Sequence, residues 1–148
     1  MRKAALCFVV CLLAAAGWAA GGEKGTQEEA KALLDKAVKA IETSGEAKAL
    51  AAFNDPKGGF QDRDLYVFCS GPDKKVTAHI DKAMLGRDET TIKDVDGKAV
   101  GAEILAIGEK GGGTVEYKWK NPVSGNVETK VSFVKKAGSQ VCGVGAYK

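Results

Sequence analysis

The spacing of apolar residues divides the chain into three stretches. Residues 4–16 are continuously apolar, residues 27–53 carry apolar residues at helical spacing, and apolar and polar residues alternate in several segments after residue 65. An apolar period near 3.6 indicates an amphipathic helix, and a period of two indicates a half-buried strand. The pattern predicts a short apolar N-terminal run, then helices, then a sheet.

The apolar N-terminal run has the features of a secretory signal peptide. It follows the basic Arg2 and Lys3, and Gly17 and Ala19 satisfy the small-residue preference at a cleavage site. Its length of about 13 residues is short of the roughly 20 that a membrane span needs, although an uncleaved N-terminal anchor stays an alternative. We predict a signal peptide at 1–19, a flexible lead-in at 20–25, one domain at 26–148, and a periplasmic or secreted location.

Two helices are expected at the start of the domain. Thr26 and Glu29 form a capping-box pattern, in which each side chain satisfies a free backbone amide of the other residue. The apolar spacing that follows predicts a helix over 27–43 and a second, shorter helix over 46–53. The turn-forming cluster 54–59 ends the helical part of the chain.

The remainder of the chain predicts an antiparallel sheet. The mixed segment between the second and third strands is irregular or briefly helical over 81–91, and we favour a short helix over a strand within 98–107. The fold class is therefore α+β with five strands. The expected strands are 65–70, 76–80, 114–120, 127–135 and 140–147.

The 114–120 and 127–135 strands place two aromatic residues beside a lysine. If the hairpin pairs across its six-residue loop, Tyr117 faces Lys130, and Trp119 lies on the same sheet face. An ammonium, a phenol and an indole wall suit a small carboxylate ligand. The alternative is a half-buried sheet face with a lysine whose charged end reaches water.

Other chemistry has little support in the sequence. His79 is the single histidine, and it could hydrogen-bond an acid ligand, although a lone histidine is more often structural. The Asp94–Gly97 turn resembles the start of a calcium loop but lacks the closing glutamate. No nucleophile elbow or phosphate loop is present, so we expect no enzyme activity, metal or cofactor. Basic and acidic residues are interspersed, so we expect no nucleic acid partner.

Two cysteines remain once the predicted signal peptide is removed. Cys7 and Cys11 belong to the apolar N-terminal run, whereas Cys69 and Cys142 belong to the domain. An even pair of cysteines in an oxidising compartment is a candidate disulfide. Two free buried thiols are the alternative.

A series of short segments, in this order and spacing, resembles the single Cache domain, a small extracytoplasmic PAS-like sensor type. The resemblance covers about 26–148, and no one segment decides it. The segments are FNDPKGGF (53–60), DLYVF (64–68), Ala78-His79, Leu85-Gly86, DVDGK (94–98), YKWKNP (117–122), KVSFV (130–134) and GVGAY (143–147).

The resemblance implies a PAS-like five-stranded antiparallel sheet of order 2-1-5-4-3 behind a long N-terminal helix. The ligand pocket would lie over one sheet face beneath the 81–107 segment, and ligands would be small metabolites, often short organic acids. The implied order also makes the strands of Cys69 and Cys142 neighbours, which favours the disulfide. The residues that match pocket-lining stretches are Tyr66, His79, Tyr117, Trp119 and Lys130.

Family members usually form the periplasmic parts of chemoreceptors and sensor kinases, with a membrane helix after the last strand, whereas this sequence ends at Lys148. We therefore expect a free-standing binder of a short organic acid, with no stable membrane insertion after cleavage. Lys130 would pair with the carboxylate, and Trp119 would wall the pocket. Tyr66, His79 and Tyr117 would donate hydrogen bonds. The alternative is an accessory or docking subunit of a membrane receptor or sensor kinase, in which the pocket is only core.

Overall fold

Two helices lead the part of the chain that the computed structural model describes, residues 24–148. They are α1 (Gln27–Ser44) and α2 (Glu46–Phe53). The backbone N–H of Glu29 donates to Thr26 Oγ1 at 3.1 Å, and the Thr26 N–H donates to Glu29 Oε2 at 2.8 Å. The capping box is confirmed, and both helices lie within one residue of their predicted bounds. The predicted signal peptide lies outside the described residues.

All strand pairings in the sheet are antiparallel, and the order is β1-β2-β6-β5-β4, with β3 also paired to β2. The predicted α+β class is confirmed. The two-residue β1 is additional to the five strands expected from the sequence, because so short a strand has no readable alternation. The strands are β1 (Gln61–Asp62), β2 (Leu65–Ser70), β3 (Val76–Ala78), β4 (Gly113–Lys120), β5 (Val127–Ala137) and β6 (Gln140–Tyr147).

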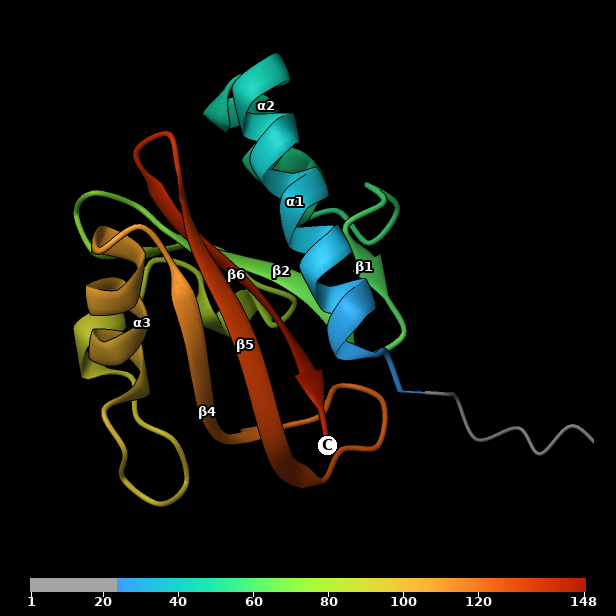
Figure 1. The fold of residues 1–148 in the computed structure, drawn as a ribbon, viewed down its shortest axis with the longest axis vertical. Helices are drawn as coiled ribbons and strands as arrows, with labels where there is room; N and C mark the ends of the chain where they lie inside the picture. The colour runs from blue at the N-terminus through green and yellow to red at the C-terminus, as the bar shows by residue number, and fades with distance from the viewer. Residues whose placement is uncertain (1–23) are drawn as a thin grey trace, which may run out of the picture.

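The connection from β3 to β4 lies on one side of the sheet. It contains two short 3-10 helices, η1 (Lys82–Met84) and η2 (Glu89–Thr91), followed by α3 (Val100–Glu109). The short helix favoured within this segment is therefore confirmed, although it begins and ends two residues later. Figure 1 shows the sheet between α1 on one side and α3 on the other.

Both faces of the sheet are covered, and successive residues of each strand serve different faces. On the α1 face, Val67 and Val144 are fully buried against the two N-terminal helices. On the opposite face, Phe68 packs with Val115 and with Ile104 of α3. Because β2 is buried on both faces, its sequence is a continuous apolar run rather than an alternating one.

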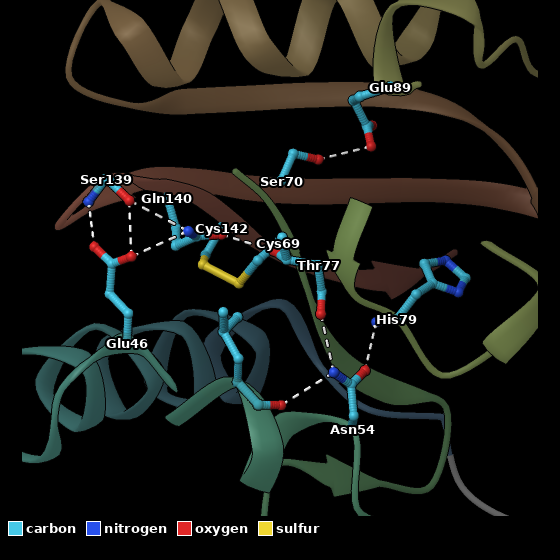
Figure 2. The surroundings of a disulfide bond; sticks show 11 residues. Glu46, Asn54, Cys69, Ser70, Thr77, His79, Glu89, Ser139, Gln140 and Cys142 are labelled. Carbon is cyan, nitrogen blue, oxygen red and sulfur yellow. Dashed lines mark hydrogen bonds between the residues drawn. A yellow bond between two sulfur atoms is a disulfide. The ribbon is translucent and has the colours of Figure 1, made fainter. Parts of the chain in front are cut away.

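A disulfide joins Cys69 of β2 to Cys142 of β6, which confirms the predicted pairing. The two residues lie directly opposite each other, with Cα atoms 4.1 Å apart. Both are buried on the α1 face. Figure 2 shows the bond between the N-terminal helices and the sheet. The bond therefore links the two central strands β2 and β6 on the sheet face opposite α3.

The first two described residues are packed against the domain. The Gly25 N–H donates to Asp64 Oδ1 at 2.7 Å, and a Cβ at position 25 would clash with Leu65. Lys24 forms a salt bridge of 2.7 Å with Glu128. Lys24 and Gly25 are the last two residues of the predicted lead-in, and both contact the domain in the structure. Their contacts are with distant residues, which local composition does not reveal.

Candidate functional site

A small cavity lies on the sheet face opposite α1, beneath the segment between β3 and β4. Its volume is about 20 Å³, which is room for about one water molecule. A wider groove of about 490 Å³ opens beside it, between residues 79–84 and the β4–β5 loop. The side chains that line both spaces are Tyr66, His79, Met84 and Trp119. These four therefore mark the junction between the inner cavity and the outer groove.

The β4–β5 hairpin has the predicted register, which places Tyr117 opposite Lys130 and Trp119 opposite Glu128. Tyr117 and Trp119 pack edge to face, with ring centroids 5.8 Å apart. His79 packs edge to face on Tyr66 at 5.1 Å. Four of the predicted pocket residues therefore meet at the inner cavity, and they come from β2, β4 and the end of β3.

Lys130, the fifth predicted residue, lies behind Tyr66 rather than on the cavity wall. Its side chain is 1 % exposed. Its Nζ is 3.9 Å from the Tyr66 ring centroid, 5.1 Å from that of Tyr147 and 5.5 Å from that of Phe68. A Cβ at Gly145 would lie 2.5 Å from Lys130 Cε. The glycine in β6 therefore leaves the space through which the lysine reaches these rings.

The charge of Lys130 is poorly compensated. Burial lowers the pKa of Lys130 to about 7, and Asp64 opposes this shift only in part. The oxygens of Asp64 already accept hydrogen bonds from Gly25 N and Asn121 Nδ2. Within residues 24–148, Lys130 forms no salt bridge and its Nζ donates no hydrogen bond to a protein acceptor. An ammonium in this position is a ready partner for an anion.

His79 is a neutral hydrogen-bond donor. Burial and the charge of Lys130 lower the pKa of His79 to about 4. The backbone N–H of Asp81 donates to His79 Nδ1 at 2.9 Å, so we assign the ring hydrogen to Nε2. Asn54 Oδ1 accepts the His79 backbone N–H at 3.1 Å and holds this residue at the end of β3 (Figure 2).

The tyrosines at the cavity are neutral. Burial raises the pKa of Tyr66 and of Tyr117 above the usual tyrosine value. The Tyr117 hydroxyl lies 2.9 Å from Ser132 Oγ, and either oxygen can be the donor. Tyr117 is therefore already positioned by a protein partner, and its availability to a ligand depends on how this hydrogen bond is oriented.

Sequence reasoning missed one charged residue of the inner cavity, Glu89 of η2. It is 5 % exposed, and Ser70 Oγ donates to its Oε2 at 2.8 Å. Burial raises the pKa of Glu89. Figure 2 shows this pair on the opposite side of the sheet from the disulfide. The polar run around Glu89 resembles a surface loop, so no sequence signal distinguishes its buried side chain.

Residues 24–148 contain no group of three or more histidine, cysteine, aspartate or glutamate side chains arranged to hold a metal ion. The same residues contain no helix with the length and apolar character needed to cross a membrane.

The fold is similar to those of solved bacterial sensor domains. A methyl-accepting chemotaxis protein from Vibrio parahaemolyticus RIMD 2210633 superposes with a TM-score of 0.69 at 24% identity, over 81% of this chain and 86% of that one. A Cache chemosensory domain described for its carboxylic acid recognition superposes with a TM-score of 0.60 at 25% identity, over 81% of this chain and 86% of that one. Both likenesses establish the architecture.

A curated relative is similar over a shorter stretch. The sensor histidine kinase MctS from Rhizobium johnstonii (strain DSM 114642 / LMG 32736 / 3841) is 41% identical over 49 residues, which are 33% of this chain and 11% of that protein. The match therefore spans about a tenth of the length of the kinase.

The family assignment rests on most of the sequence. Residues 11–146 match the family described as single Cache domain 2. Cache domains are extracytoplasmic, non-catalytic sensory domains that bind small molecules in chemoreceptors and sensor histidine kinases. The chain belongs to the single Cache domain 2 family.

Proposed function

We propose that this domain senses a small carboxylate, bound at the junction of the inner cavity and the outer groove. The observation that carries the proposal is the ammonium of Lys130, which is buried among aromatic rings with no acidic partner within salt-bridge distance in residues 24–148. A buried charge is costly unless it is paired. A ligand carboxylate would supply the missing partner.

The neighbouring residues suit the same ligand. His79 would donate from Nε2, the phenols of Tyr66 and Tyr117 are further donors, and Trp119 would close the apolar side of the site. The inner cavity has room for about one water molecule, and Lys130 lies behind Tyr66. We therefore expect the Tyr66 ring and the side chains at the mouth to move when the acid enters.

The comparisons support this ligand class at the level of the family. The Cache chemosensory domain that recognises carboxylic acids is 25% identical to this chain and has the same fold. We propose the same class here on the basis of Lys130. We further propose that residues 1–19 are a signal peptide and that residues 26–148 form the sensor domain in the periplasm or outside the cell. We propose a chemoreceptor or a sensor kinase as the protein partner.

A thermal-shift screen of short carboxylic acids, amines and purines tests the proposal, followed by calorimetry on each hit. We expect a carboxylic acid to raise the melting temperature, and Lys130→Met to weaken its binding at least tenfold. Lys136→Met is the matched control, because Lys136 lies on the same strand with its charge exposed and paired to Glu109. Equal binding by Lys130→Met and the parent protein would refute the role of Lys130.

A second candidate function is an accessory or docking subunit in which the pocket is part of the core. The small volume of the inner cavity favours this alternative. It predicts that no small molecule stabilises the protein. It also predicts that Val76→Leu, which adds bulk at the wall of the inner cavity, leaves the activity of the associated receptor or kinase unchanged.

A further inference from the structure

Glu89 is a buried acidic residue at the inner cavity, and the proposed binding of a carboxylate gives it no role. Its Oε2 accepts a hydrogen bond from Ser70 Oγ at 2.8 Å. Its Oε1 accepts no hydrogen bond from any residue in 24–148. No completely inaccessible side-chain oxygen or nitrogen in the described residues lacks a hydrogen-bond partner, so Oε1 is not completely inaccessible. Glu89 lines the inner cavity, so a ligand group that enters the cavity would reach its carboxylate.

The position of Glu89 is fixed by its backbone. Its N–H donates to the carbonyl of Lys74 at 2.8 Å. Helix α3 packs directly on the Glu89 carbonyl at Gly101, where any Cβ would clash with that oxygen. These contacts fix the backbone of Glu89 beside α3, and the hydrogen bond from Ser70 holds its carboxylate on the pocket face.

Glu89 and Lys130 lie toward opposite ends of the pocket face of β2. Tyr66 and Ser70 have side chains on this face and are four residues apart in the strand, which is about 13 Å of extended chain. The Lys130 ammonium lies over Tyr66, whereas the Glu89 carboxylate is bonded to Ser70. The site therefore has a cation near one end and a free hydrogen-bond acceptor near the other.

We propose that Glu89 selects, among small carboxylic acids, those that carry a hydroxyl or ammonium group at the end away from the carboxylate. Such a donor would pair with Oε1, whereas a plain alkyl end would leave this buried oxygen unpaired. The second carboxylate of a diacid would face Glu89 and be repelled, which excludes diacids. This inference rests on the proposed function, because it assumes that the ligand carboxylate lies toward Lys130.

Calorimetry with matched acids tests the selection. The three-carbon set is propionate, 3-hydroxypropionate, β-alanine and malonate, and the four-carbon set is butyrate, 4-hydroxybutyrate, 4-aminobutyrate and succinate. In the parent protein we expect the hydroxy or amino acid of one set to bind at least tenfold more tightly than its plain acid, and the diacid to bind at least tenfold more weakly. Glu89→Gln removes the penalty on the diacid, whereas Glu28→Gln, an exposed change on α1, leaves the ranking unchanged.

Two further probes, n-propylamine and 1-propanol, separate this inference from the proposed function. If all acids bind with equal affinity and their binding depends on Lys130, the role of Glu89 is overturned and carboxylate sensing is supported. A second outcome is that the amine or the alcohol binds, that Glu89→Gln abolishes this binding, and that no acid binds. This outcome would refute carboxylate sensing but would support the recognition of a hydrogen-bond donor by Glu89. Absence of binding by every probe would refute both. If Glu89→Gln does not fold, the ranking of acids by the parent protein decides.

Discussion

The two faces of the sheet are built from the same strands and have opposite characters. On the α1 face, Leu34, Phe53 and Val144 are at most 1 % exposed and pack around the Cys69–Cys142 disulfide. On the pocket face, β5 contributes Lys130 and Ser132, and β6 contributes glycines at two positions. Alternation of side chains separates a face that stabilises the fold from a face that holds buried polar groups. Substitutions on the two faces should therefore have separable effects.

The largest effect is expected from the disulfide. Cys69→Ala with Cys142→Ala opens a loop with a sequence separation of 73 residues, which should cost about 4 kcal/mol of unfolding free energy. Urea denaturation measures the loss. At temperatures where the variant is folded, calorimetry should show unchanged acid binding. A loss of binding in the folded variant would show that the two faces are not independent.

Alanine substitutions at the two glycines of β6 test the packing of the pocket face. Gly143→Ala would crowd Phe68, whereas Gly145→Ala would crowd Lys130 and Ser132. Each should cost about 2 kcal/mol, because an added methyl overfills a packed site. Only Gly145→Ala should also weaken acid binding, since it displaces the lysine. Equal effects of the two variants on binding would contradict the path assigned to the Lys130 side chain.

The titration of Lys130 should make stability depend on pH. The folded pKa is about 7, and the unfolded value is about 10.4. Between these values the unfolded chain binds more protons, so stability rises with pH, by about 2 kcal/mol from pH 7 to pH 9. Parallel urea denaturation of Lys130→Met isolates this contribution. If the parent and the variant show the same slope, burial does not lower the pKa of Lys130.

The smallest effect concerns His79. Its folded pKa is about 4, below the unfolded value of about 6.5. The unfolded chain therefore binds more protons between these values, and stability falls as the pH falls, by about 1 kcal/mol from pH 7 to pH 5.5. His79→Gln should show a smaller loss over the same range. An equal loss would mean that carboxylates alone account for the acid sensitivity.

The sequence was informative where a local pattern determines the structure. The Thr26–Glu29 capping box marked the start of α1, and the short β4–β5 loop fixed the register that pairs Tyr117 with Lys130. The Cys69–Cys142 pairing required more, because it followed from the strand order that the family resemblance implied.

The sequence was least informative where long-range packing decides the structure. The burial of Glu89 depends on Ser70, Gly101 and the cavity, none of which its neighbours in sequence reveal. Periodicity placed Lys130 on the correct face, but its position behind Tyr66 depends on the missing side chain at Gly145. The contacts of Lys24 and Gly25 are likewise with residues distant in the chain.

The most direct test of the account measures the pKa of Lys130 with and without a bound acid. An NMR pH titration of ¹³Cε-labelled lysine resolves this residue, and Lys130→Met identifies its signal. We predict a pKa near 7 in the free protein and a clear rise when the protein is saturated with the carboxylic acid that stabilises it most, because a bound carboxylate favours the ammonium. An unchanged Lys130 pKa in the acid-bound protein would contradict the proposal that Lys130 is the carboxylate partner.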